Sequence, residues 1–387
     1  MPAASASPIR PVLDHLIDAV DHQRVGSGVL AVLDAVPDPR KPRGIRHQVN
    51  TILALAVCAV MAGCRSFTAI GEWAADASEQ VLSALGAECA SSESTMRRTL
   101  QCLDGDELDS AIGAWAAGRT EPASTRRRVV AVDGKRIRGS GRSTQAARHL
   151  LAAIDHAHAV VLAQREVGCK TNEITEFAPL LDGVELTGAV VTADALHAQK
   201  AHADYLVLQR GAHYLLTVKG NQPGLSAQLK ALPWKQVPLA HTSTDRAHGR
   251  VEKRAIKIVT VTTGILFPHA RQAIQITRKT RRLDGTTWTT EVANAVTSLA
   301  AEHATASQLA SWVRGHWHIE NRLHWVRDVT FDEDRSHIRS GSGPRVMASL
   351  RNLVISILRL NGTTNIAQAL RHHAWDPHRP ITILTTC

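Results

Sequence analysis

The sequence lacks several patterns that would assign it to a familiar class of protein. Its six cysteines include no Cys-x-x-Cys pair, which gives neither a zinc ribbon nor a disulfide framework, so we expect reduced, buried thiols. Its first 22 residues lack a basic start followed by an apolar run, so we predict no signal peptide. The longest apolar run, residues 52–64, is too short to span a bilayer, and we expect a cytoplasmic protein without a membrane partner.

The chain carries a large excess of positive charge. Its 45 lysine and arginine residues outnumber 35 acidic residues, which gives a net charge of +10 and an isoelectric point near 9.7. This excess suits a polyanionic partner, most simply nucleic acid, although a basic protein with no such partner is the alternative on charge alone. With 387 residues, the chain can bury a large core and is expected to form two or three domains.

Residues 1–122 are predicted to form a helical N-terminal domain. Apolar residues recur at helical spacing in three of its segments, residues 12–35, 52–64 and 67–75. The proline-rich stretch 37–42 ends the first helix and forms a stiff connector to the second.

A further helix of this domain is a weak candidate for reading DNA. It spans residues 92–103, begins at a serine N-cap, and turns its apolar residues inward. Arg97 and Arg98 lie on its outer face, as in the second helix of a helix-turn-helix. We therefore treat both as candidate DNA contacts, with a solvated arginine pair as the alternative.

From residue 128 onward, strands alternate with helices. Three β-branched runs are predicted to form an antiparallel meander, residues 129–132, 149–154 and 160–164. A helix to residue 181, a strand at 189–192, a helix at 198–209 and a strand at 214–218 follow. This order, β-β-β-α-β-α-β, is that of the ribonuclease H-like fold. We predict a mixed α/β protein whose ribonuclease H-like catalytic domain spans residues 123–345, followed by a helical segment at 346–387.

A β-rich insertion is predicted within that domain at about residues 224–300. Its alternating runs carry many basic side chains, which suit contacts with DNA phosphates. His248, Arg250 and Arg254 are the candidate DNA contacts in this insertion. A solvated basic edge that prevents aggregation is the alternative.

Two aspartates each end a hydrophobic strand of the predicted domain. Asp133 follows the first strand and Asp194 follows the fourth, and the predicted topology places these strands side by side. Two neighbouring carboxylates repel each other, and a divalent cation relieves the repulsion. Because the ligands are hard oxygens without clustered cysteines, Mg²⁺ or Mn²⁺ is favoured over zinc.

The stretch 311–339 is predicted to be a helix that presents a third carboxylate. At helical spacing, Glu320 shares one face with two histidines and an arginine, His316, His324 and Arg327. Neighbouring tryptophans, Trp317 and Trp325, can pack this helix against the rim of the sheet. Glu320 would complete a cage for two ions roughly 3.5–4 Å apart. A zinc site at the histidines is a weaker alternative.

Asp328 is the rival for the third carboxylate. It lies eight residues after Glu320, about two helical turns further along the axis. It stands beside Arg327 and before an acidic run that is expected to leave the core. A weak surface ion pair is therefore the preferred interpretation of Asp328.

Several long motifs carry a resemblance to a known family. In order they are VVAVDGKRIRG, GAVVTADALHAQK, YLLTVKGNQP, HGRVEKR and HWHIENRLHWVRDVTFDED. Over nearly its whole length the chain resembles the DDE transposases of bacterial insertion sequences, in the ISAs-type or H-repeat-associated branch. The resemblance implies metal-dependent DNA cleavage and strand transfer, with Asp133, Asp194 and Glu320 as the catalytic triad and metal ligands.

The proposed helix departs from a broader related group of transposases, which carries Tyr, Arg, the catalytic Glu and Lys at fixed spacing. Val313 and His316 stand at the Tyr and Arg places, and Arg327 stands at the Lys place. Arg327 can hold a DNA phosphate as well as lysine can, whereas His316 can do so only when protonated. Whether this chain uses the hairpin route of that group is left open.

The remaining predictions concern partners. Further candidate DNA contacts flank the triad, namely Lys135, Arg136, Lys219, Asn221, Gln222 and Asn321. The resemblance implies double-stranded DNA as partner, both the terminal repeats of the element and the target, with a homodimer in the DNA complex and a nucleoid-associated location. A nuclease of the same fold that does not join DNA, or a non-catalytic DNA-binding regulator, are the alternatives.

Overall fold

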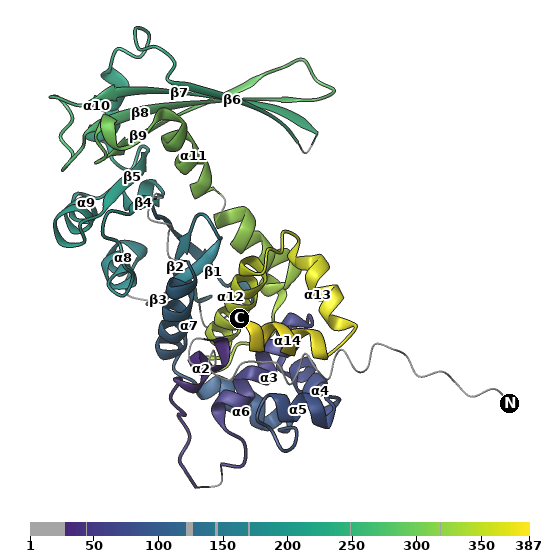
Figure 1. The fold of residues 1–387 in the computed structure, drawn as a ribbon. Helices are drawn as coiled ribbons and strands as arrows, with labels where there is room; N and C mark the ends of the chain where they lie inside the picture. The colour runs from purple at the N-terminus through teal and green to yellow at the C-terminus, as the bar shows by residue number, and fades with distance from the viewer. Residues whose placement is uncertain are drawn as a thin grey trace.

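A nine-stranded mixed sheet runs through the molecule, in the order β3-β2-β1-β4-β5-β9-β8-β7-β6 (Figure 1). The computed structural model describes residues 28–43, 45–120, 127–143, 146–168, 171–247, 249–317 and 319–387. Two groups of helices, one from each end of the chain, gather at the β3 side of this sheet. Within the described residues, no helix is long and apolar enough to cross a membrane.

The first five strands form the predicted ribonuclease H-like sheet. They are β1 Val129–Arg136, β2 His149–Asp155, β3 Val160–Val167, β4 Val190–Ala193 and β5 His213–Val218. β1, β2 and β3 form an antiparallel meander, while β1, β4 and β5 run parallel. β4 is buried along its whole length, as expected for a central parallel strand covered on both faces. This order and these directions confirm the predicted fold.

Helix α8 (Glu173–Leu181) makes the crossover from β3 to β4. Asn172 caps it, and the Thr175 side chain accepts from the Asn172 backbone N–H, which completes a capping box. The crossover from β4 to β5 contains α9 (Lys200–Asp204) and a π-helical turn, Tyr205–Gln209. Both crossovers return the chain to the same end of the sheet, so the carboxyl ends of β1 and β4 lie at one edge.

The predicted β-rich insertion continues the same sheet as a long antiparallel ribbon. α10 (Pro223–Ala231) leads into β6 His241–Ala247, β7 Arg250–Thr260, β8 Gln272–Arg282 and β9 Thr289–Thr297. β9 pairs antiparallel with β5 and joins the ribbon to the core. Three of these strands were predicted, whereas β6 was not, because this edge strand is polar on both faces and shows no hydrophobic alternation.

The N-terminal and C-terminal helices share one hydrophobic core. The N-terminal set is α2 Val29–Asp34, α3 Val49–Met61, α4 Phe67–Ala75, α5 Glu79–Ala84, α6 Glu93–Cys102 and α7 Gly105–Arg119. The C-terminal set is α12 Gly343–Leu360, α13 Ile366–Ala374 and α14 His378–Thr386. α12 is buried over most of its length and packs against α3, α7 and β3. The domain boundaries stay a prediction, but these two sets are not packed as separate bodies.

A buried polar network fastens the helices to the sheet. Asp109 of α7 accepts from Arg345 of α12 at 2.9 Å and from Gln164 of β3 at 3.1 Å. Burial raises the pKa of Asp109, while Arg345, Ser349 and Gln164 oppose that rise. The pairing of Asp109 with Arg345 satisfies a carboxylate that would be costly to bury alone.

The predicted single helix over residues 311–339 is wrong. α11 (Ala306–His316) ends where the chain turns at Trp317, and two π-helical segments follow, η6 (Glu320–His324) and η7 (Val326–Thr330). A π-helix bonds each residue to the fifth along, so side chains beyond Glu320 rotate off the face that α-helical spacing predicts. Arg327, which lies after this change, pairs with Glu333, and His316, the last residue of α11, contacts Thr192.

Candidate metal-binding carboxylate site

Strand pairing brings the two predicted aspartates to the same edge of the sheet. The last residues paired between β1 and β4 are Val132 and Ala193, and Asp133 and Asp194 come directly after them. Asp133 lies within β1 rather than at its end, because the strand continues against β2 as far as Arg136. Asp194 caps a short 3₁₀ turn and accepts from the backbone N–H of Leu196 at 2.9 Å.

Asp133 is the electrostatic centre of this edge. Burial, together with the carboxylates of Asp194, Glu173 and Glu320, raises its pKa to about 7. The backbone N–H of Gly134, which donates to the Asp133 carboxylate at 2.9 Å, opposes the rise. A carboxyl group whose charge is disfavoured by burial and by like charges is one that a bound cation would stabilise.

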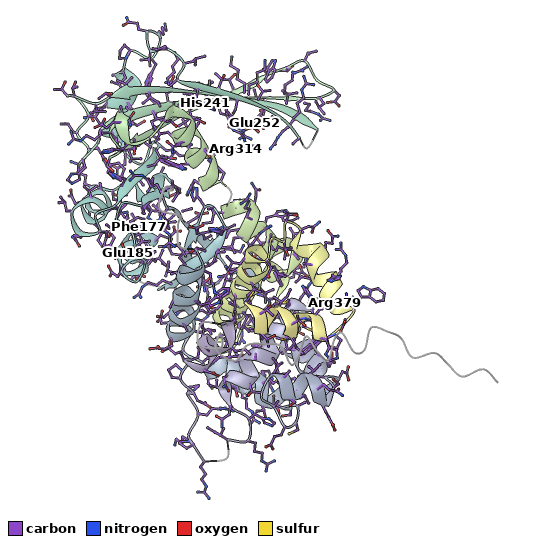
Figure 2. All side chains as sticks on the ribbon, in the orientation of Figure 1. Phe177, Glu185, His241, Glu252, Arg314 and Arg379 are labelled. Carbon is purple, nitrogen blue, oxygen red and sulfur yellow. The ribbon has the colours of Figure 1, made fainter. Side chains whose placement is uncertain are left out.

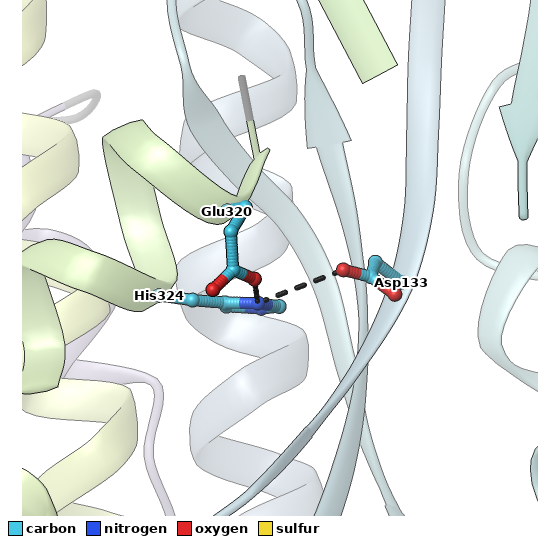
Figure 3. Close-up of side chains that lie close together, drawn as sticks. All are labelled: Asp133, Glu320 and His324. Atoms are coloured by element: carbon cyan, nitrogen blue, oxygen red, sulfur yellow. Dashed lines mark hydrogen bonds and ion pairs between the residues drawn. The ribbon is translucent and has the colours of Figure 1, made fainter. Parts of the chain in front are cut away.

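Glu320 and Asp133 meet across a histidine (Figure 3). The Nδ1 atom of His324 lies 3.2 Å from Glu320 Oε2 and 3.6 Å from Asp133 Oδ2. One ligand atom from each of these three residues falls within 4.8 Å of the others. His324 is 3% exposed, and burial lowers its pKa although Glu320 opposes the shift, so the imidazole is neutral. Sequence spacing placed His324 beside Glu320 but did not identify it as part of the site.

The three predicted carboxylates are not equivalent. Asp133 and Glu320 belong to the compact cluster with His324, whereas Asp194 lies outside it and acts on Asp133 through its charge. Among the described histidines considered for zinc, only His324 joins a cluster with metal-ligand spacing, and His318 lies outside the described residues. His316 contacts Thr192 at 3.4 Å, and burial lowers its pKa to about 4. The expected phosphate contact of a protonated His316 is therefore wrong near neutral pH.

Glu173 is a second residue that sequence reasoning missed. It stands at the start of α8, where His149 Nε2 approaches within 2.8 Å and His197 Nε2 within 3.4 Å. Burial raises its pKa, but these two histidines outweigh burial and lower the pKa to about 2. A Cβ atom at residue 134 would lie within 2.7 Å of the Glu173 carboxylate, so Gly134 lets this carboxylate lie directly against β1. No local motif marks this contact, because it joins β1 to a helix 40 residues later in the chain.

Asp328 forms an ion pair, as predicted, but with a different partner and in a more enclosed place. Lys135 of β1 donates to both Asp328 oxygens at 2.6 Å, and the Lys135 side chain is 8% exposed. Burial raises the pKa of Asp328, while Lys135 opposes that shift. Lys135 was predicted to contact DNA, and that contact stays a prediction; in this structure Asp328 holds its ammonium group.

Arg327 was also predicted to hold a DNA phosphate, and the structure contradicts this prediction. It is 1% exposed, and it pairs with Glu333 at 2.7 Å. Glu333 belongs to a 3₁₀ turn, η8 (Glu333–Arg335), and also pairs with Arg351 of α12 at 2.8 Å. The acidic run, residues 332–334, was expected to leave the core. Its middle residue, Glu333, instead connects η7 to α12.

The two tryptophans beside Glu320 do not pack the segment against the sheet. Trp317 is 60% exposed and Trp325 is 53% exposed. Asn321, a predicted DNA contact, is exposed and donates to the Trp317 carbonyl at 3.3 Å. The segment is held instead by its buried residues, Ile319, Leu323 and Val326, and by the Arg327 pair. The expectation of aromatic packing is wrong.

The remaining candidate DNA contacts differ in their solvent exposure and in their ion pairs. Lys219, Arg136 and Arg98 are exposed, and Arg97 pairs with Glu93 at 3.0 Å. The Asn221 and Gln222 amides tie the loop after β5 to Ala195 and Gln199, beside Asp194. Arg250 is 49% exposed, whereas Arg254 is held by Asp245 and Glu252. Figure 2 labels Glu252 on the β6–β9 ribbon. His248 lies outside the described residues.

Comparisons with known proteins agree with this arrangement. Residues 124–357 match the family described as Transposase DDE domain, and residues 30–116 match the one described as DDE_Tnp_1-associated. The H repeat-associated putative transposase YhhI of Escherichia coli K12 is 27% identical over 339 residues, which cover 84% of this chain and 89% of that protein. The putative transposase YncI of Escherichia coli O157:H7 is 27% identical over 349 residues, 86% of this chain and 87% of that protein.

A solved piggyBac transposase synaptic complex with hairpin DNA aligns with a TM-score of 0.42 and 9% identity, covering 94% of this chain and 79% of that one. At that score the likeness carries no argument about the site. The family match shows which family the chain belongs to, because residues 124–357 span more than half of the 387 residues. The ribonuclease H-like sheet with carboxylates at one edge and this match together show that the chain belongs to the transposase DDE domain family.

Proposed function

We propose that this transposase cuts the ends of an insertion sequence and joins them to target DNA with Asp133, Asp194 and Glu320 as its catalytic carboxylates. The observation that supports the proposal best is the convergence of charge on Asp133. Strands β1 and β4 bring Asp194 beside it, Glu320 approaches from η6, and these neighbours act with burial to raise the pKa of Asp133 to about 7. A carboxyl group whose pKa is shifted in this way is typical of sites that bind a cation or transfer a proton.

The residues present fit a divalent cation. The donor set at the Asp133 cluster is two carboxylates and one imidazole, and Asp194 adds a third carboxylate from the neighbouring strand β4. Carboxylate oxygens of this kind suit Mg²⁺ and Mn²⁺. When bound, such ions supply charge neutralisation at the phosphodiester and activation of the attacking hydroxyl group.

The side chains around the carboxylates would position both ligands and DNA. His324 Nδ1 and Glu320 Oε2 form a hydrogen bond, which lowers the pKa of Glu320 so that it stays ionised. Lys135 adds to that lowering from its place beside Asp328. Lys219 is exposed at the end of β5, close enough to His316 to affect its pKa, and offers a cation for a DNA phosphate at the rim of the site.

DNA as the partner follows from the family and from the charge of the chain. The net charge of +10 and the exposed arginines of the β6–β9 ribbon and of α6 are suited to the phosphate backbone. We propose that the ribbon binds DNA without sequence preference and that α6 contributes to recognition of the element's ends. A homodimer in the DNA complex, with each protomer bound to one end, is part of this proposal.

A paired-end DNA substrate tests the proposal. With Mg²⁺, the unaltered chain is expected to give both cleaved ends and joined product, whereas Asp133→Asn and Asp194→Asn should give neither while DNA binding is retained. Asp76→Asn, at an exposed position after α4, is the matched control and should behave like the unaltered chain. Cleavage without joining would reduce the function to a nuclease, and binding alone in the unaltered chain would indicate a regulator.

A further inference from the structure

We propose that His324 is a nitrogen ligand of the metal held by Asp133 and Glu320, and that it biases this position from Mg²⁺ toward Mn²⁺. The inference rests on the proposed function, since it uses the same carboxylates. It goes beyond that function by assigning a ligand that the DDE pattern does not contain and by predicting that the two metal positions differ.

The distances between His324, Glu320 and Asp133 suit three side chains that bind one metal ion. Two ligands that bind one ion at right angles, each at about 2.1 Å, lie roughly 3 Å apart. His324 Nδ1 lies 3.2 Å from Glu320 Oε2 and 3.6 Å from Asp133 Oδ2, with all three ligand atoms within 4.8 Å (Figure 3). A small inward movement of the exposed Glu320 side chain would place three donors around one centre.

The second ring nitrogen of His324, Nε2, is buried away from the two carboxylate contacts. His324 is 3% exposed, and its Nε2 atom has no hydrogen-bond partner among the described residues. Its Nδ1 atom is aimed at the two carboxylates. The inference therefore rests on the position of Nδ1 between the two carboxylates.

The type of donor then affects the choice of metal. Mg²⁺ takes oxygen ligands in a strict octahedron and gives up its waters reluctantly, whereas Mn²⁺ accepts mixed nitrogen and oxygen sets. Among the described residues, the cluster with metal-ligand spacing takes its one nitrogen from His324, and Asp194 lies outside that cluster. We expect one oxygen-rich position that accepts Mg²⁺ and one mixed position that prefers Mn²⁺.

Electron spin echo spectroscopy of Mn²⁺ added to the full chain tests this inference without any cleavage assay. The unaltered chain should show nitrogen coupling from a bound imidazole, and labelling of its histidines with ¹⁵N should change that coupling. His324→Asn keeps an N–H donor near the Nδ1 position but removes the imidazole. It should lose the coupling and weaken Mn²⁺ binding by about tenfold or more, with a smaller change for Mg²⁺.

The controls separate this inference from the proposed function. His337→Asn, at an exposed histidine outside the cluster, should keep both the coupling and the affinity. Bound Mn²⁺ without nitrogen coupling, or unchanged Mn²⁺ affinity in His324→Asn, would show that His324 only positions Glu320 by a hydrogen bond. Asp133→Asn should lose Mn²⁺ in either case, and if it does not, the proposed carboxylate site itself is wrong.

Discussion

At the scale of single residues, environment distinguishes the two carboxylates that compete for the catalytic role. The Glu320 side chain is 63% exposed and faces Asp133 through His324, so it can move onto a ligand. Asp328 is held at both oxygens by Lys135 and is half as exposed. A carboxylate that is already paired on both oxygens has less capacity to bind a cation than one that is open to solvent on one side.

We therefore expect Glu320→Gln to lose both cleavage and strand transfer while still binding the element's ends, because an amide oxygen is a weak substitute for a carboxylate ligand. Asp328→Asn should keep measurable cleavage, since it leaves Asp133, Asp194 and Glu320 intact. The measurement is turnover of a labelled end substrate by both variants at equal DNA occupancy. A dead Asp328→Asn beside an active Glu320→Gln would move the active site to η7.

At the scale of elements, the π-helical segments η6 and η7, the first of which carries Glu320, depend on a buried ion-pair network. Glu333 is fully buried between Arg327 of η7 and Arg351 of α12. Burial raises the pKa of Glu333, but the two arginines outweigh it and lower the pKa to about 2. This network connects the segment that carries Glu320 to the helical core, so its loss should affect both stability and the placement of the site.

Glu333→Gln is expected to lower the free energy of unfolding by about 3–5 kcal/mol, because it leaves two buried arginines without their counter-charge. Urea unfolding followed by circular dichroism measures the loss. Glu302→Gln, at an exposed position before α11, is the matched control and should change stability little. An unchanged midpoint in Glu333→Gln would show that the network does not hold the segment.

The same group predicts a pH dependence. The folded-state pKa of Glu333, about 2, is below the ordinary value of 4.5, so the unfolded chain binds more protons between these values. The stability that ionised Glu333 contributes is therefore complete above pH 4.5 and is lost as the pH falls toward 2. Unfolding at several pH values should show the gap between the unaltered chain and Glu333→Gln narrowing in that window, and a gap that widens would contradict the assignment.

The β6–β9 ribbon contains two neighbouring arginines that should behave differently. Arg250 is half exposed and only loosely paired with Glu252, whereas Glu252 and Asp245 hold Arg254. If Arg250 contacts a phosphate, Arg250→Gln should weaken binding to specific and random DNA alike. It should also reduce the slope of log K against log salt by about 0.9.

Arg254→Gln is the comparison, and it should mainly destabilise the ribbon, because it removes the cation between two carboxylates. Fluorescence anisotropy across a salt series measures both slopes, and thermal unfolding measures the stability of both variants. Equal slopes in Arg250→Gln and the unaltered chain would remove the proposed phosphate contact from this strand.

At the scale of the whole molecule, the chain's two ends are interdependent. α3 is buried along nearly its whole length, and its neighbours include α12, α13 and α14 from the other end of the chain. Asp109 and Arg345 add a charge pair across the same interface. Removing the N-terminal helices would expose a large apolar surface on α12 and leave Arg345 without its buried partner.

A chain that lacks residues 1–118 is therefore expected to aggregate or to unfold without cooperativity, rather than to act as a transposase that has lost end preference. Sedimentation and thermal unfolding check this. A soluble, cooperatively unfolding product would show that the catalytic domain folds alone. End recognition should instead be tested with Arg97→Gln and Arg98→Gln, which change exposed side chains of α6 and leave its buried face intact.

Much of the fold could be predicted because it depends on local patterns. The β-branched runs of β1 to β5 are buried strands, α4 has its predicted bounds, and α6 begins after a serine N-cap, as predicted. The strand order then follows from a known topology, and with it the adjacency of Asp133 and Asp194. α5 and α7 were not predicted, because short or mixed apolar patterns are decided by the core that they cover.

Only the tertiary structure decided which groups meet. Lys135 pairs with a residue 193 positions away, Glu173 contacts two histidines from other elements, and His324 of η6 lies 3.6 Å from Asp133 of β1. Hydrophobic period and residue type describe what a segment can bury, and they act over a few neighbouring residues. The partners of a buried charge are set by the packing of segments that are distant in the sequence. The sequence by itself therefore determined the fold and the adjacency of Asp133 and Asp194. Only the folded chain determined which side chains surround them.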